Sequence, residues 1–401
     1  MTRISSVEQF RQGIDNILNQ QARMNETQLQ LSTGKRVNKP SDDPLATTQL
    51  LKLSTLKSKT EQYSRNIASA RNELGLQETV LTGVSNLLMR VRELVIQANS
   101  AAQSNETRAV ISDELNNRLD ELLQAANTKD PNGEYIFSGF NSRTPAYVAS
   151  GNGYVYQGDQ GERLLQVSED TQLAVRKNGD DLFSGMKLGD GRFVLQSPTT
   201  NTGNAIVTLE SASDATLDTY TLTFAQATAD DPVTYSVTGA ASGVVATGTY
   251  RSGDDISFNG VTLSVSSEPE GGDTYTISEA GNQSIFQTVR DVADLLGSEL
   301  STNAERAKQS NDLSHAIDSL DQAFFHIQTQ RTSLGVSLQS LDLRDDQNQD
   351  SVLRIDKQMS ELEDLDYAEA VSELNLQTVA LQAAQQSYIK IQGLSLFNFM
   401  R

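Results

Sequence analysis

The chain contains few groups of residues whose type and spacing suit chemistry. One is Ser32-Thr33-Gly34-Lys35, which is similar to the end of a phosphate-binding loop. Such a loop needs an opening glycine at position 29 and a Ser or Thr after the lysine. Those positions hold Leu29 and Arg36. The tetrapeptide is therefore better explained as a turn, and we predict no cofactor site there.

Two histidines and several acidic pairs are the other candidates for metal or acid–base chemistry. His315 and His326 would share one face of a helix, but no third ligand accompanies them. The segment Asp130-Pro131-Asn132-Gly133 has the wrong spacing for a calcium loop and is typical of a turn. Acidic pairs such as Asp345 with Asp346 are most simply caps and turns. Since no nucleophile, base and oxyanion donor can be combined, we predict no catalytic or metal site and no enzyme.

Composition narrows the class of protein further. The 401 residues carry a net charge of -20, which argues against nucleic acid as a partner. The absence of cysteine excludes disulfides and thiolate chemistry. The first residues lack the apolar core of a signal peptide, and no stretch approaches the roughly 18 apolar residues of a membrane span. These patterns predict a cytoplasmic protein, with no membrane insertion, unless an export route without a cleaved signal exists.

Both ends of the chain carry a heptad pattern of apolar residues, which keeps one stripe on one helix face for pairing with another helix. Because isolated helices are marginal in water, the two ends need each other or a neighbouring molecule. We therefore predict an assembly coiled coil formed by these two stripes. The stripe residues, with polar residues set among them, are Val7, Phe10, Ile14, Ile17, Gln21, Met24, Gln28 and Leu31, and then Val371, Leu374, Thr378, Leu381, Gln385 and Tyr388.

Helix-breaking residues are concentrated between the two ends. Residues 129–283 hold 19 of the 26 glycines and most of the prolines, which predicts a β-rich middle between helical flanks. Asp43 before Pro44 is a helix start signal, so we expect a helix from residue 45 to about 100. A shorter helix to about residue 127 follows, and a second long helix is predicted over 285–341. Apolar residues at alternating spacings of four and three predict a buried seam on each long helix, from Tyr63 to Val95 and from Leu313 to Leu341. Strands are predicted at 134–140 and, with period-2 alternation, through the centre.

These elements predict a mainly α protein with an inserted all-β part. Its long helical rod or coiled coil is built from both termini, and a β-rich outer domain lies at the far end. Three parts are expected. Residues 1–40 and 355–401 form a terminal coiled-coil domain. Residues 41–190 and 284–354 form a helical rod domain with a β-hairpin region at 134–176, and residues 191–283 form an inserted β domain.

Three segments, taken together and in order, resemble the flagellin superfamily. They are residues 31–51, residues 87–127 and residues 366–401. The likeness covers both helical flanks but not residues 190–280. The turn Lys39-Pro40-Ser41-Asp42-Asp43-Pro44, the segment 133–140 and the aromatic C-terminus at 396–400 are more similar to the hook-associated members than to filament flagellins.

The resemblance implies a structural junction subunit of the bacterial flagellum, placed between hook and filament. It implies type III export of an unfolded chain without a cleaved signal, an export chaperone, and an extracellular location. The implied partners are other copies in a tubular ring, the preceding hook-associated protein, and flagellin. Two alternatives remain open: a flagellin-type filament subunit, and a phage tail or surface adhesin rod with a β tip.

The resemblance also implies roles for individual residues. The capped turn formed by Arg36, Asp42, Asp43 and Pro44 would set the angle between helices and contact a neighbouring subunit. A second group matches the part of flagellin that an innate immune receptor recognises, and it implies recognition of the free monomer. That group is Arg90, Leu94, Gln97 and Glu114.

Overall fold

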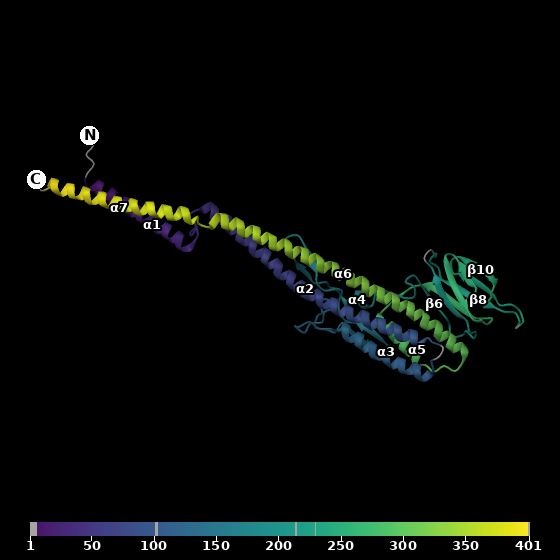
Figure 1. The fold of residues 1–401 in the computed structure, drawn as a ribbon. Helices are drawn as coiled ribbons and strands as arrows, with labels where there is room; N and C mark the ends of the chain where they lie inside the picture. Colours follow the sequence, from purple (N-terminus) through teal and green to yellow (C-terminus); the bar gives the residue numbers. More distant parts are fainter. Residues whose placement is uncertain (1–5, 101–102, 213–214, 229, 400–401) are drawn as a thin grey trace. The chain divides into compact units, whose positions relative to one another are not determined.

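The computed structural model describes residues 6–100, 103–212, 215–228 and 230–399 (Figure 1). The chain forms two compact units. The first combines residues 1–65 with 343–401, and the second is residues 66–342. Helices dominate both flanks and strands dominate the middle, so the mainly α fold with an inserted β part is confirmed. The three-part division into domains stays a prediction.

The first unit consists of helices. The terminal helices α1 (Ser6–Thr33) and α7 (Tyr367–Phe399) lie side by side (Figure 1). The unit also contains the start of α2 (Pro44–Ala98) and the end of α6 (Asn303–Glu363). There the Nζ of Lys57 lies 2.6 Å from Oδ1 of Asp356, joining α2 to α6.

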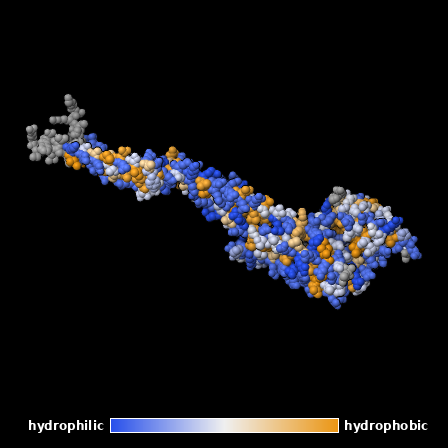
Figure 2. Space-filling view, in the orientation of Figure 1, coloured by the Kyte–Doolittle hydropathy of each residue, from blue (hydrophilic) through white to orange (hydrophobic). Residues whose placement is uncertain are grey.

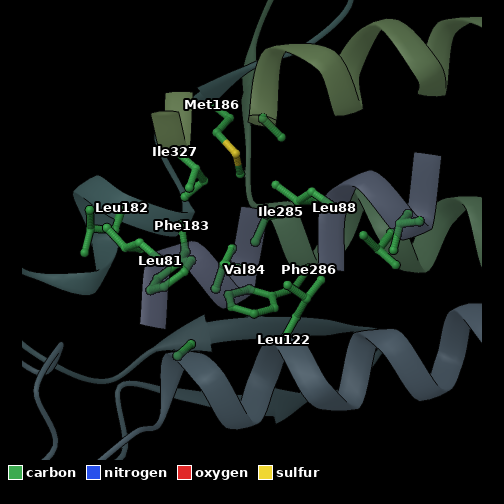
Figure 3. Close-up of a cluster of buried hydrophobic side chains, with 14 of the residues drawn as sticks. Leu81, Val84, Leu88, Leu122, Leu182, Phe183, Met186, Ile285, Phe286 and Ile327 are labelled. Atoms are coloured by element: carbon green, nitrogen blue, oxygen red, sulfur yellow. The ribbon is translucent and has the colours of Figure 1, made fainter. Parts of the chain in front are cut away.

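The second unit is built on a helical seam. The α2 residues of the predicted pattern are buried from Ile67 to Val95, and α3 (Asn105–Ala126) covers them with Leu115, Leu119 and Leu122. The predicted 4-3 spacing of α6 is also confirmed, because every seventh residue is almost completely buried. Figure 3 shows how leucine, valine and phenylalanine side chains fill this core. The α6 residues of the seam are Leu313, Leu320, Ile327, Leu334 and Leu341.

The prediction of one continuous helix over 285–341 is wrong. Helix α5 (Ile285–Gly297) ends first, and α6 begins at Asn303 and continues through the polar run 345–350. The interpretation of Asp345 and Asp346 as a cap or turn is therefore also wrong, because both lie within α6. The N–H of Glu305 donates to Oγ1 of Thr302 (3.2 Å), and the N–H of Thr302 donates back to Oε2 of Glu305 (2.9 Å). This reciprocal capping box starts a new helix. Thus α5 turns back to pack on α3.

Short hairpins and loops cover the seam. Strands β1 (Tyr147–Ser150) and β2 (Gly153–Tyr156) pair, as do β3 (Leu164–Gln166) with β4 (Gln172–Ala174) and β5 (Met186–Lys187) with β14 (Asn282–Gln283). A one-turn helix, α4 (Gly179–Phe183), precedes β5. The predicted strand at 134–140 is wrong, because its backbone groups bond to scattered loop atoms, such as the Phe137 carbonyl with the N–H of Gly179.

The inserted β part has two sheets around one core. The first sheet has the strand order β10-β9-β8-β13-β6 and the second β11-β12-β7. Both contribute to one buried cluster, with Phe193, Tyr220 and Tyr275 from one sheet and Val207 and Leu263 from the other. The predicted alternation is confirmed. The strands are β6 (Phe193–Gln196), β7 (Ile206–Ser211), β8 (Tyr220–Ala225), β9 (Thr234–Gly239), β10 (Gly243–Thr249), β11 (Asp255–Phe258), β12 (Val261–Ser266) and β13 (Thr274–Glu279).

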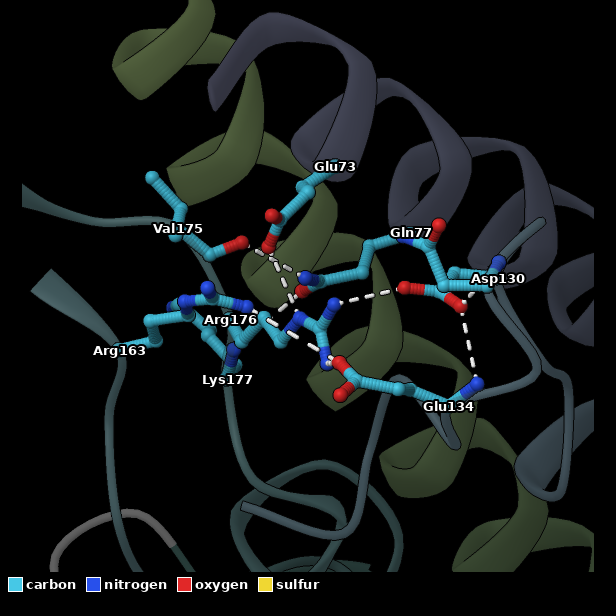
Figure 4. A network of polar contacts seen from close by, with 9 residues as sticks. Glu73, Gln77, Asp130, Glu134, Arg163, Val175, Arg176 and Lys177 are labelled. Carbon is cyan, nitrogen blue, oxygen red and sulfur yellow. Dashed lines mark hydrogen bonds and ion pairs between the residues drawn. The ribbon is translucent and has the colours of Figure 1, made fainter. Parts of the chain in front are cut away.

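A buried charge network ties the hairpin region to α2 (Figure 4). The Arg176 side chain is only 4% exposed and forms ion pairs with Glu73 (2.8 Å), Asp130 (2.8 Å) and Glu134 (3.1 Å). Next to it, Nε2 of Gln77 donates to the Val175 carbonyl (2.9 Å). The guanidinium of Arg176 thus connects the segment after β4 to helix α2, through Glu73, and to the turn at residues 130–134.

Candidate functional site

The turn between α1 and α2 is a compact polar structure. The N–H of Ala46 donates to Oδ1 of Asp43 (2.9 Å), which makes Asp43 the cap of α2 with Pro44 as its first residue. Asp42 accepts the N–H groups of Asn38 (3.1 Å) and Lys39 (2.8 Å). The predicted start of α2 is therefore confirmed, and both carboxylates are used within the turn.

The same turn is fastened to the junction between α6 and α7. The backbone N–H of Arg36 donates to the Glu363 carbonyl (2.7 Å), and the N–H of Leu365 donates to the Gly34 carbonyl (3.0 Å). The Arg36 side chain pairs with Asp43 (3.2 Å) and also reaches the Leu362 carbonyl (2.8 Å). We call residues 34–44 with 362–366 the clasp. Contact of its charged residues with a neighbouring subunit stays a prediction.

Gly34 is the position where the clasp depends most on glycine. Its φ of +71° lies in the left-handed region, and a Cβ there would lie 2.8 Å from the Tyr367 hydroxyl. We expect Gly34→Ala to cost about 1–2 kcal/mol from the backbone alone. Urea denaturation should show this loss, whereas Gly75→Ala, in open space on α2, should not reduce stability. Equal stability of Gly34→Ala and wild type would contradict the role given to the clasp.

The clasp should weaken in acid. The Lys39 N–H lowers the pKa of Asp42, and the Ala46 N–H lowers the pKa of Asp43, from an ordinary value of 3.8. A carboxylate whose pKa is lower in the folded state than in the unfolded state stabilises the fold at pH values above its unfolded-state pKa. This stabilisation is lost as the pH falls through the folded-state pKa. We therefore expect the amide resonances of Lys39 and Ala46 to shift together below pH 3.8 in an NMR titration. Resonances that move only near pH 6 would contradict this assignment.

Helices α1 and α7 pack through a seam that differs from the predicted stripe. Gly13 lies against the Tyr388 ring, and Nε2 of Gln20 lies 3.5 Å from the Gln377 carbonyl. Ile14 (45% exposed) and Val371 (47% exposed) lie outside the seam. The side chains of Val7 and Phe10 are not among those that the structure describes. The predicted residues that are at least partly buried are Ile17, Met24, Leu31, Leu374, Thr378, Leu381 and Tyr388.

This difference has a physical reason. The alternate seam positions hold small or polar residues that allow close approach, including Thr27, Ala370 and Gln377, all of which are buried. A heptad pattern based on large apolar residues instead selects the residues next to these positions, such as Val371 in place of Ala370. Consequently aliphatic residues remain on the outer faces, and Figure 2 shows hydrophobic residues scattered along these helices. The most exposed are Leu18 (57%), Leu376 (70%), Val379 (64%) and Ile389 (65%).

The group implied for immune recognition lies where α2 meets α3. Arg90 forms ion pairs with Glu114 (2.9 Å) and Glu93 (3.3 Å). Gln97 is exposed, whereas Leu94 is 1% exposed and belongs to the core. The folded protein therefore presents three of the four residues to a partner, and recognition stays a prediction.

Lys35 and His326, two of the candidates for chemistry, have structural partners, whereas the buried Nε2 of His315 has none among the described residues. Lys35 pairs with Glu363, and Nε2 of His326 lies 2.8 Å from the Asp181 carbonyl. Burial lowers the pKa of His315 to about 4. Among the described residues, no group of three or more His, Asp or Glu is placed to hold a metal ion. In the same residues, no helix is long and apolar enough to cross a membrane.

Comparison with known proteins defines the class of protein. Residues 9–142 match the bacterial flagellin N-terminal helical region, and residues 317–400 match the bacterial flagellin C-terminal helical region. The flagellar hook-associated protein 3 of Escherichia coli is 26% identical over the full length of both chains. Together with the paired terminal helices, these matches place the chain in the flagellin superfamily.

Solved structures narrow the family. The crystal structure of flagellar hook associated protein-3 from Legionella pneumophila is 32% identical, covers 77% of this chain and 98% of its own, and has a TM-score of 0.74. The flagellar junction protein FlgL from the same organism is 31% identical, covers 79% of this chain and 99% of its own, and has a TM-score of 0.71. The chain belongs to the family of flagellar hook-associated protein 3.

Proposed function

We propose that this protein is the structural subunit that joins the flagellar hook to the flagellin filament. The observation that carries the proposal is the full-length match to flagellar hook-associated protein 3 of Escherichia coli. A solved structure of a flagellar junction protein, which is 31% identical to this chain, supports it. A filament flagellin is less well supported, because the flagellins of Listeria innocua and Escherichia coli match only 48% and 31% of this chain. A structural role, without catalysis, follows from this family.

The terminal helices are the elements we propose for assembly. A helix that is apolar around most of its circumference is normally buried. Helix α7 has aliphatic residues both in its seam with α1 and on its outer faces, with Leu376 and Val379 mostly exposed. Neighbouring copies in a tubular ring, with the preceding hook-associated protein on one side and flagellin on the other, would cover those faces.

Export is proposed to precede assembly. A narrow type III channel needs an unfolded chain, and no disulfide opposes unfolding because the chain has no cysteine. The paired terminal helices carry few large buried apolar residues, which suits ends that fold only on assembly. Before export, a cytosolic chaperone would bind these ends and keep them from associating. The final location proposed is extracellular, in the flagellum, without a cleaved signal peptide.

Ordered reconstitution tests this function. Purified protein should add to isolated hooks that carry the preceding hook-associated protein, and flagellin should then elongate only on hooks so treated. Alone, the protein should not polymerise into long filaments, since a junction is a short zone. Long filaments from the pure protein would support the filament-subunit alternative instead. A helical rod with a carbohydrate-binding β part would support the adhesin alternative.

A further inference from the structure

A polar cavity of about 690 Å³ lies in the 66–342 unit, where α2 ends and α3 and α6 begin. Arg108 from the first turn of α3 and Arg306 from the first turn of α6 both line it. Asn and Gln side chains make up much of the remaining lining, including Asn204 just before β7. None of the described lining residues is acidic, although the chain carries 52 acidic residues against 32 basic ones.

Arg108 is a buried cation with no acidic partner among the described residues. Its residue is 7% exposed. Its Nη1 donates to the Gln103 carbonyl (3.0 Å), its Nη2 donates to Oδ1 of Asn105, and its Nε has no partner among the described residues. Both partners are neutral, so they satisfy hydrogen bonds but leave the charge unbalanced. A buried charge without a counter-charge is costly, which favours an anion from outside.

Arg306 adds to the positive potential of the cavity. Burial lowers the pKa of Arg108, and the positive charge of Arg306 lowers it further, so the two guanidinium groups are close enough to repel. Arg306 itself is exposed, and its Nη1 donates to the neutral Oδ1 of Asn303 (3.5 Å). An anion between the two arginines would turn this repulsion into two attractions.

The backbone contributes in the same direction. The N-terminus of α3 lies at the cavity, and helix N-termini attract negative charge. The N-terminus of α6 contributes less, because Oε2 of Glu305 already accepts the N–H groups of Ser301 (2.7 Å) and Thr302 (2.9 Å). The C-terminus of α2, which favours cations, also lies at the cavity and opposes this effect. The positive charge in this space therefore comes mainly from the two arginines, with a smaller contribution from the N-terminus of α3.

We propose that this cavity binds a small hydroxylated organic anion, with its carboxylate or phosphate group between Arg108 and Arg306. Arginine forks suit both groups. The volume of the cavity falls in the range of roughly 300–1,000 Å³ that small-molecule sites occupy, well above the need of a single inorganic ion. The amide side chains of the lining bind the hydroxyl groups. Sugar acids and sugar phosphates share this chemistry.

Isothermal titration calorimetry of the full chain at low salt tests the proposal. The probes are glucuronate, glucose 6-phosphate, inorganic phosphate and uncharged glucose. At least one of the two sugar anions should bind saturably with one site per chain. Tighter binding of glucuronate would identify the charged group as a carboxylate, and tighter binding of glucose 6-phosphate would identify it as a phosphate. Glucose and inorganic phosphate should each bind at least about tenfold more weakly, since each lacks one half of the recognised chemistry.

Variants connect the binding to this cavity. Arg306→Gln changes an exposed residue, so it keeps the fold and should weaken binding about tenfold through loss of a charge-assisted bond. Arg108→Gln should weaken it at least as much. Arg143→Gln removes the same charge from an exposed loop and should change nothing. The proposal is overturned by absence of binding for both sugar anions, by equal binding of glucose or inorganic phosphate, or by unchanged affinity in Arg306→Gln.

Discussion

Replacing Arg176 by Met should lower the free energy of unfolding of the 66–342 unit by about 3 kcal/mol, because it leaves the buried Asp130 carboxylate without its counter-charge. The Asp130 side chain is 6% exposed, and the lost guanidinium pairs with it at 2.8 Å. Glu73 and Glu134 lose partners as well. Urea denaturation followed by circular dichroism measures the change.

Arg163→Met is the matched control for that measurement. The Arg163 side chain is 52% exposed and lies 3.9 Å from Glu134, a distance at which a surface ion pair contributes about 0–1 kcal/mol. Its substitution should leave the unfolding transition nearly unchanged. An equal loss in both variants would show that net charge, not the buried network, determines the effect.

The double variant Leu376→Asp/Val379→Asp should be exported and folded but absent from flagella. Both side chains are mostly exposed on α7, so the substitutions cost the free protein little. In an assembled tube, each such aliphatic side chain would contribute about 1.5–3 kcal/mol by burial. Each Asp would replace that gain with the cost of a buried charge. Motility on soft agar in a null background should be lost.

A second double variant separates this effect from added charge alone. Leu217→Asp/Val244→Asp makes the same replacements at exposed positions of the inserted β part, 58% and 66% exposed. We expect normal motility from it. If the α7 variant restored motility as well as wild type does, the outer faces of the terminal helices would not be assembly surfaces.

The spacing of apolar residues along the sequence predicted which residues are buried in the long helices. The 4-3 pattern in α6 selected Leu313, Leu320 and Ile327 correctly, because large apolar residues fill that seam. The same rule missed Thr27 and Gln377 between α1 and α7, where close approach favours small and polar residues. A hydrophobic pattern thus reports burial only when packing uses large side chains.

Long-range polar contacts lay beyond sequence reasoning. Asp130 is recognisable as a turn residue, since it accepts the N–H groups of Asn132 and Glu134. Its pairing with Arg176, 46 residues later, has no local signal. The break before α6 did have one, the Thr302 and Glu305 capping box, which the surrounding helical pattern obscured. A tertiary contact determined the first feature, whereas a local cap determined the second.

Electron microscopy of labelled flagella tests the central claim, that this protein forms the hook–filament junction. Because the chain has no cysteine, Ala241→Cys places a single thiol on an exposed turn between β9 and β10. Gold coupled to that thiol, in cells that lack the wild-type copy, should appear as one narrow band between hook and filament. Gold distributed along the whole filament, or absent from flagella, would contradict the claim.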